Sequence, residues 1–129
     1  MPPSWDYQND IPLVPVRIIG KELSISSLAL IDTGAKYCVL HEQLSRALRL
    51  LAIGEDSFRG FGGKGRFRSK LVSGETELAG RRHKVAFASI SDVHFPMVAP
   101  KIVLGRNLLN LFKITLDGPN KKIVIDQDR

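Results

Sequence analysis

Short apolar runs, separated by glycine, proline and polar residues, follow one another along the chain of 129 residues. Apolar and polar positions alternate over 23–26, a pattern typical of a strand with one buried face. The largely apolar runs at 28–31 and 101–104 favour strands buried on both faces. The other expected strands cover 11–19, 37–40, 75–78 and 83–88, with hairpins over 58–72 and 114–126.

Two segments have the composition of short helices. Residues 42–50 contain many helix formers, and the leucines at 44, 48 and 51 would share one face. Residues 106–112 are expected to form one or two helical turns. Many short strands with one or two short helices predict an all-β, barrel-like domain. We expect this domain to cover 11–126, between an N-terminal extension at 1–10 and a C-terminal tail at 127–129.

The composition excludes several protein classes. With 43% hydrophobic and 25% charged residues, it is ordinary for a globular domain. No apolar run approaches the roughly 18 residues that span a bilayer, so we expect no membrane segment. Cys38 is the only cysteine, so no intrachain disulfide can form, which suits a reducing, cytoplasmic location. The three histidines lack metal-ligand spacing, and we expect no metal.

The formal net charge of +6 is concentrated in two basic stretches, 59–70 and 81–84. Such stretches are one sign of a nucleic-acid-binding surface. However, Arg66 and Arg68 alternate with Phe67 and Ser69, as on the exposed face of a strand. No base-stacking or groove-reading motif accompanies the charge, so nucleic-acid binding is the less favoured interpretation.

Asp32 stands at the end of an apolar run, where an unpartnered carboxylate would be costly to bury. Gly34 permits a tight turn that brings backbone N–H groups close to this carboxylate. Thr33 offers a hydroxyl that could bond to another chain. The Asp-Thr-Gly sequence also occurs in ordinary turns, so by itself it is only a candidate catalytic motif.

Three segments of the sequence, taken together, strengthen the case for Asp32 as a catalytic residue. The segment 30–40, Leu-Ile-Asp-Thr-Gly-Ala-Lys-Tyr-Cys-Val-Leu, resembles the active-site loop and following strand of the retropepsins, the retroviral-type aspartic proteases. A second signature of that family is similar to 102–109 and includes Leu104, Gly105, Arg106 and Asn107. Between them, 58–68 resembles the family's flap, tipped by Gly60, Phe61, Gly62 and Gly63. The resemblance implies a retropepsin-like half barrel with a glycine-tipped flap.

The resemblance also implies a mechanism. Aspartic proteases use two carboxylates that share one proton, one acting as base and the other as acid on a bound water. This chain has a single Asp-Thr-Gly, so the site requires a homodimer in which Asp32 faces its symmetry mate. Peptide bonds would be hydrolysed without metal or cofactor, and a peptide or protein substrate would bind as an added strand.

Further site residues follow from the same resemblance. Thr33, Gly34 and Ala35 would complete the active-site loop, and the expected subsite walls are Ala29, Lys36, Lys101 and Val103. Lys36 stands where retroviral members often carry an acidic residue that pairs with the arginine of the second signature, here Arg106. An alternative function is therefore a retropepsin-fold dimerisation or peptide-binding module with little or no proteolysis.

Overall fold

The strands of this chain form two sheets in the computed structural model, which describes residues 2–59, 65–91 and 100–126. The strands are β1 (Ser4–Asp6), β2 (Leu13–Ile19), β3 (Ser24–Ile31), β4 (Cys38–His41), β5 (Leu51–Arg59), β6 (Arg66–Leu78), β7 (Arg81–Ile90), β8 (Ile102–Leu104), β9 (Lys113–Asp117) and β10 (Lys122–Asp126). The helices are α1 (Glu42–Ala47) and α2 (Arg106–Leu109). Neither described helix is long and apolar enough to cross a membrane.

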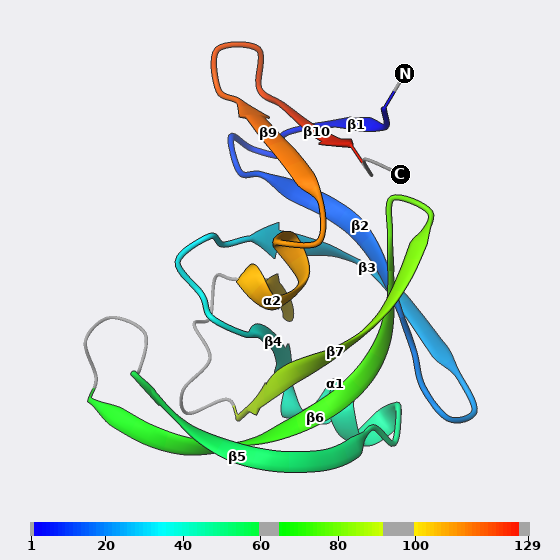
Figure 1. Cartoon of the computed structure of the whole chain (residues 1–129), viewed down its shortest axis with the longest axis vertical. Coiled ribbons are helices and arrows are strands. Elements are labelled where there is room, and N and C mark those ends of the chain that lie inside the picture. The colour runs from blue at the N-terminus through cyan, green and yellow to red at the C-terminus, as the bar shows by residue number, and fades with distance from the viewer. Residues whose placement is uncertain (1, 60–64, 92–99, 127–129) are drawn as a thin grey trace.

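The larger sheet has the order β2-β3-β8-β4-β7-β6-β5, and β2 also pairs with β6. This additional pairing joins Arg17–Ile19 to Glu75–Glu77 and closes the sheet into a barrel. The strands β5 and β6 continue beyond the barrel as a long curved hairpin, which extends to the left in Figure 1. The prediction of an all-β, barrel-like domain is confirmed.

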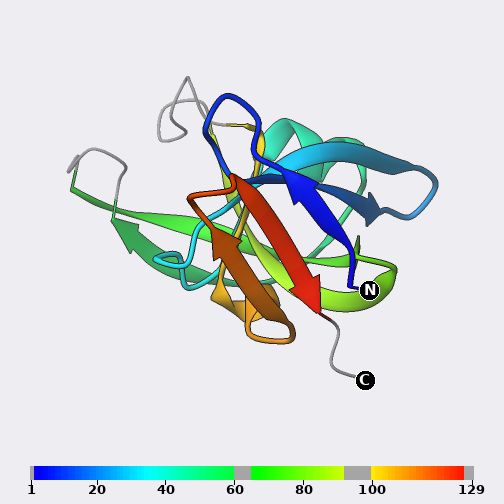
Figure 2. The ribbon, with the colours of Figure 1, turned by 90° about the horizontal axis from the view of Figure 1, so that it is seen from above.

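The smaller sheet has the order β1-β10-β9 and lies at the opposite end of the molecule from the β5 hairpin (Figure 1). Its three strands lie side by side in the view of Figure 2. Residues 1–10, expected to be an extension, therefore contain a strand that pairs with β10. Ile123 and Ile125 of β10 are fully buried against the main core, so the two sheets share one interior.

Alternating residues of the strands build that interior. Along β2, for example, Val14, Val16 and Ile18 are buried, while Pro15 between them is exposed. Fully burying such a side chain contributes roughly 1.5–3 kcal/mol of transfer free energy. The largest side chains with no exposure include Phe87, Leu40, Leu48, Ile102, Leu104 and Leu108.

The position of β8 decides where the candidate site forms. β8 pairs in parallel with β3 and antiparallel with β4, so it lies between these two strands. The register sets Ile31 beside Leu104. The residues that follow each strand, Asp32 and Gly105, therefore leave the barrel side by side.

Several local predictions were wrong. Helix α1 ends at Ala47, because Arg49 adopts a left-handed backbone conformation with φ 54° that no helix continues through. Leu51 consequently lies outside the helix, begins β5 and is 72% exposed. The run 28–31 is not buried on both faces, since Leu28 is 40% exposed. The pairs of strands expected over 23–31 and 66–78 are single continuous strands, β3 and β6.

Candidate active site

The carboxylate of Asp32 is held by its own turn at the end of β3. The backbone N–H of Asp32 donates to the carbonyl oxygen of Leu104 at 3.0 Å, which ties the turn to β8. The N–H of Gly34 donates to Asp32 Oδ1 at 3.0 Å, and a β-carbon at Gly34 would lie 3.3 Å from that oxygen. A larger residue would crowd the carboxylate, so this turn favours glycine. Asp32 is half-buried, and its side chain stays accessible from outside.

The second signature packs directly behind this loop. A β-carbon at Gly105 would lie 2.3 Å from the carbonyl oxygen of Tyr37, a distance that no side chain can occupy. The N–H of Arg106 donates to Ala35 O at 2.8 Å, and the N–H of Asn107 donates to Lys36 O at 3.3 Å. The first turn of α2 therefore fixes the path of the chain between Asp32 and β4.

Asn107 and Cys38 complete this support. Asn107 Oδ1 accepts the N–H of Cys38 at 2.9 Å, and Asn107 Nδ2 donates to Ala86 O at 2.8 Å, so one amide joins β4 to β7. Cys38 is fully buried, and burial raises the pKa of its thiol to about 12. A thiol in that state is not a nucleophile, which supports its expected role as a core residue.

A cleft of about 490 Å³ opens beside Asp32, between its loop and the β5–β6 hairpin. It is lined by Asp32, Gly34, Ala35, Lys36, Tyr37, Val39, Asp56, Ser57, Phe58, Arg59, Arg66, Phe67 and Ile90. Tyr37 and Phe58 meet edge to face with ring centroids 5.8 Å apart, and Phe58 and Phe67 are 6.0 Å apart. The cleft thus combines aromatic walls with five charged groups.

Asp56 is the centre of a small polar cluster in this cleft. Its Oδ1 accepts the N–H of Ser57 at 2.7 Å, its Oδ2 accepts the hydroxyl of Tyr37 at 3.0 Å, and Lys36 Nζ lies 3.9 Å from Oδ2. The Ser57 N–H, followed by the Tyr37 hydroxyl and the nearby cations, lowers the pKa of Asp56 below its ordinary value. This carboxylate is ionised and well partnered, which indicates a role in binding or support.

The structure places the residues singled out from the sequence in different surroundings. Asp32, Gly34, Ala35 and Lys36 meet in the cleft. Ala29 and Val103 instead belong to the core, with 0% and 2% exposure, and Lys101 is exposed with its carbonyl bonded to the N–H of His41. Leu104 is buried behind the loop, and Thr33 lies on the surface next to it. The expected flap tip, Gly60 to Gly63, lies outside the described residues.

Lys36 and Arg106, the two cations that the sequence places near Asp32, contact different groups. Lys36 turns towards Asp56, whereas Arg106 Nη1 lies 3.5 Å from the carbonyl oxygen of Thr33. Arg106 therefore contacts the backbone of the Asp32 loop, and the two cations have separate partners. Asp56 was not singled out from the sequence, because 24 positions separate it from Asp32 and no motif contains it.

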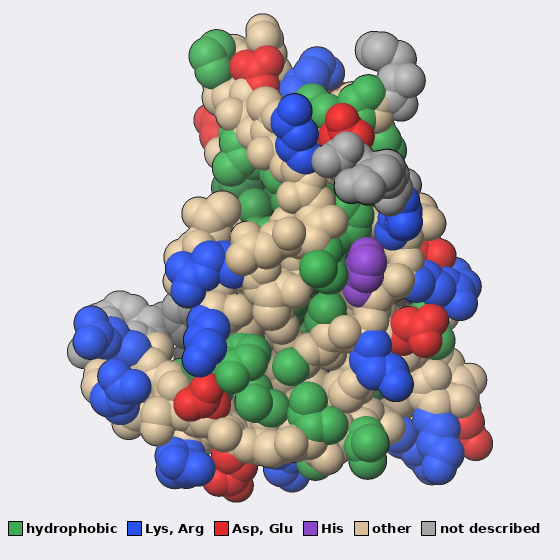
Figure 3. All heavy atoms as spheres, viewed as in Figure 1, with side chains coloured by type: hydrophobic (Ala, Val, Ile, Leu, Met, Phe, Trp, Pro, Cys, Tyr) green, Lys and Arg blue, Asp and Glu red, His purple; other side chains and the backbone are tan. Residues whose placement is uncertain are grey.

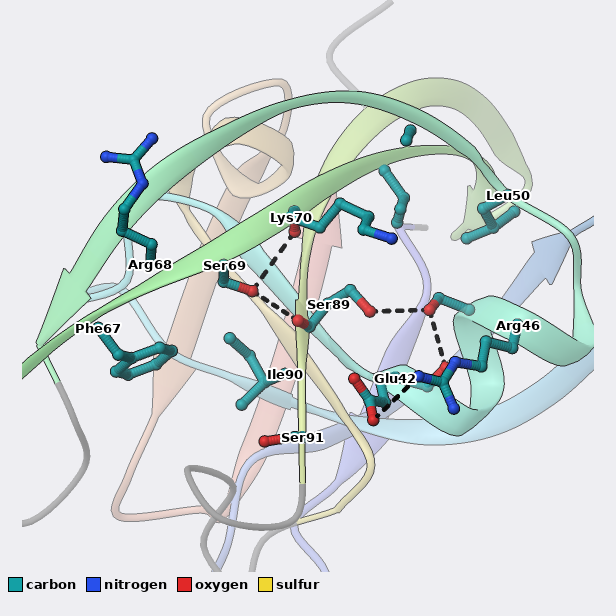
Figure 4. Close-up of a pocket in the computed structure, with 13 residues that line it drawn as sticks. Glu42, Arg46, Leu50, Phe67, Arg68, Ser69, Lys70, Ser89, Ile90 and Ser91 are labelled. Atoms are coloured by element: carbon teal, nitrogen blue, oxygen red, sulfur yellow. Dashed lines mark hydrogen bonds and ion pairs between the residues drawn. The ribbon is translucent and has the colours of Figure 1, made fainter.

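A second hollow, of about 320 Å³, lies between α1 and the β5–β6 hairpin, shares Phe67 and Ile90 with the cleft, and is drawn in Figure 4. Three of its hydroxyl groups already bond to protein atoms: the hydroxyl oxygens of Ser45 and Ser89 are 2.8 Å apart, and Ser69 donates to the carbonyl oxygen of Ser89. Arg46 is paired with Glu42 at 3.4 Å. Its one carboxylate, Glu42, is the partner of Arg46, so this hollow offers no unpaired carboxylate comparable to Asp32. The described residues also contain no cluster of His, Cys, Asp or Glu suited to a metal ion.

Comparison with known proteins agrees with this geometry. Among solved structures, the simian foamy virus (mac) protease has 14% identity and a TM-score of 0.50, covering 74% of this chain and 88% of its own. The EIAV protease has 24% identity and a TM-score of 0.51, with coverages of 78% and 86%. The retroviral protease-like domain of Ddi1 from Leishmania major has 19% identity and a TM-score of 0.54, with coverages of 90% and 88%.

These three likenesses concern the fold alone, and no curated protein matches the chain. The sequence itself is more specific. The model of the retroviral aspartyl protease family matches residues 8–117, which include the Asp32 loop, the hairpin and the second signature. The chain therefore belongs to the retroviral aspartyl protease family.

Proposed function

We propose that this protein is an aspartic endopeptidase that works as a homodimer, with one Asp32 from each chain at the catalytic centre. The observation that carries the proposal is the state of Asp32. Gly34 N–H holds Oδ1 at 3.0 Å, while Oδ2 accepts no hydrogen bond from the described residues and is open to the cleft. A half-exposed carboxylate with one oxygen fixed and one available suits a bound water.

The chemistry needs both copies of Asp32. One carboxylate removes a proton from the water, whose oxygen attacks the peptide carbonyl carbon, while the partner carboxyl protonates the carbonyl oxygen. Collapse of the tetrahedral intermediate then breaks the carbon–nitrogen bond as the amine takes up a proton. Because the chain has one Asp-Thr-Gly, a monomer would have only half of this machinery.

A surface next to Asp32 suits the second copy. Thr33 and Ile31 border an apolar hollow of about 240 Å³, whose other walls are Leu109, Asn110, Phe112, Ile114 and Leu116. Leu116 is 44% exposed in this wall, and Leu111, between the lining residues Asn110 and Phe112, is 49% exposed. β9 is also the edge of its sheet among the described strands, so its outer backbone groups can accept another strand. Covering this apolar face would bring two Asp32 loops together.

The cleft suits an extended peptide. It runs between the Asp32 loop and the β5–β6 hairpin, and a peptide bound as a strand would direct alternate side chains against Phe58, Phe67 and the charged groups. We further propose that the segment joining β5 and β6 acts as the flap, as the resemblance of 58–68 implies.

The test is cleavage of a peptide library by purified protein from acid to neutral pH. Asp32→Asn should lower the rate at least about 100-fold, the usual contribution of a general acid or base. Asp117→Asn is the matched control, since Asp117 also precedes a glycine but ends β9 outside the cleft, and it should retain the wild-type rate. Equal cleavage by wild type and Asp32→Asn would overturn the proposal. Peptide binding without cleavage would favour the alternative, a peptide-binding module.

A further inference from the structure

Two arginines face each other across the hairpin that walls the cleft. Arg59 of β5 and Arg66 of β6 are directly opposite in the strand register, and both line the same cleft as Asp32. Both are exposed, and neither forms an ion pair with any residue that the structure describes. Figure 3 shows Lys and Arg side chains gathered at the left of the view, where Figure 1 has the end of this hairpin.

This pair is unfavourable for the hairpin itself, because like charges directly opposite each other on adjacent strands repel. The rest of the hairpin avoids such repulsion. Glu55 lies opposite Lys70 in the register, and Arg68 Nη2 is 3.1 Å from Glu55 Oε1. Like charges are kept apart along the rest of the described hairpin and stand opposite each other only at Arg59 and Arg66, beside the cleft. A local preference that is broken at one such position points to function.

The other charges of the cleft do not neutralise the pair. Asp56 is committed to Ser57, Tyr37 and Lys36, whose ammonium offsets its charge. Asp32 is the remaining acidic group, and it is anchored by Gly34. Arg59 and Arg66 therefore keep their full charge towards whatever occupies the cleft. Aromatic walls beside them strengthen their attraction for an anion, because low-dielectric surroundings screen charge less than water does.

We propose that Arg59 and Arg66 select peptide substrates with an acidic side chain, Glu or Asp, at the subsite under the hairpin. A guanidinium group can donate two parallel hydrogen bonds to a carboxylate, so two of them could clamp one acidic side chain. This rests on the proposed function, which supplies the second chain. In the homodimer the pair occurs twice, so the preference should extend to both sides of the scissile bond.

The experiment measures binding separately from catalysis. Fluorescence anisotropy on the Asp32→Asn protein compares a labelled peptide containing glutamate with the same peptide containing glutamine at each position in turn. We expect the glutamate peptide to bind at least about 10-fold tighter at one position or more, equivalent to about 1.4 kcal/mol. The advantage should shrink as salt rises from about 50 to 300 mM, since exposed charges are screened.

Variants then assign the preference to the two arginines. A double variant with Arg59→Gln and Arg66→Gln should bind the glutamate peptide less than about 3-fold more tightly than the glutamine peptide. A double variant with lysine at both positions should regain part of the preference for glutamate. Arg68→Gln is the matched control, because Arg68 is paired with Glu55 outside the cleft, and it should keep the full advantage. Circular dichroism and a melting curve verify that each variant is folded.

Three outcomes would overturn this inference. The first is equal binding of the glutamate and glutamine peptides, and the second is a preference for glutamate that persists in the double variant. The third is a single-stranded oligonucleotide that binds wild type more tightly than the acidic peptide does and no longer binds the double variant. None of these depends on cleavage. A preference for acidic peptides without any cleavage by wild type would retain the inference about binding while the proposed endopeptidase activity fails.

Discussion

Gly105 and Tyr37 lie so close that a β-carbon on the glycine would be 2.3 Å from the tyrosine carbonyl oxygen and 2.4 Å from its carbonyl carbon. The neighbour is backbone, which cannot turn aside as a flexible side chain could. The contact joins the residue after β8 to the residue before β4, and through Ala35 and Lys36 it supports the loop that carries Asp32. One glycine thus couples the stability of the barrel to the geometry of the site.

Gly105→Ala should destabilise the protein by about 3 kcal/mol, because the added methyl group forces the two backbones apart. Urea denaturation followed by circular dichroism measures the loss. Gly118→Ala is the control, since a β-carbon at Gly118 would meet nothing within 4 Å, and its effect should stay below about 0.5 kcal/mol. Similar stabilities of the two variants would contradict the crowding at Gly105.

The buried thiol predicts a dependence of stability on alkaline pH. The pKa of Cys38 is raised from 9.0 in the reference state to about 12 in the folded chain, mainly by desolvation. Below pH 9 both states keep the proton, so the thiol gives no pH dependence there. Between pH 9 and 12 the unfolded chain loses the proton while the folded chain retains it, so stability falls as pH rises.

Cys38→Ala removes this titration. The variant should be less stable than wild type at pH 7 because of the cavity, and the difference should narrow steadily above pH 9. Denaturation curves at several pH values measure it. A difference that stays constant up to pH 11 would show that the thiol ionises equally in both states.

The apolar face beside Thr33 predicts which substitution should break the proposed dimer. Leu116→Glu introduces a charge on a surface that a second copy should cover, so we expect the dimer dissociation constant to rise at least about 10-fold. Sedimentation measures the monomer fraction, and peptidase activity should fall with it and recover at higher protein concentration. Leu23→Glu is the control, because Leu23 is 50% exposed in the β2–β3 turn. A Leu116→Glu protein that remains dimeric would exclude this face as the interface.

Much of the fold followed from local pattern. Alternation of apolar and polar residues located several strands to within a few positions, because strands such as β2 bury one face and expose the other. The helix over 42–50 was predicted too long, since its end depends on the left-handed backbone of Arg49 and on the pairing of Leu51 with Ser73 in β6. The pairing of β1 with β10 joins the two ends of the chain, and no local signal predicts such a contact.

The candidate site likewise contains residues that the sequence predicted and residues that only the fold brought together. Residues close in sequence, Asp32, Gly34 and Ala35, were predictable because a turn needs few neighbours and its residue types are restricted. Ala29 and Val103 were expected to line the subsites, yet they lie in the core because strand direction and sheet closure decide which face a residue occupies. Asp56 joined the site only because the β5–β6 hairpin folds over the Asp32 loop.

The sequence by itself therefore determined the family, the candidate catalytic carboxylate and much of the strand content, since each depends on short motifs and short-range periodicity. Only the tertiary structure decided what surrounds Asp32. It inserted β8 between β3 and β4, turned Lys36 towards Asp56 and set Arg59 opposite Arg66 in the wall of the cleft. These relationships link residues far apart in the chain, and they exist because barrel closure and core packing, not local preference, select the register of each strand.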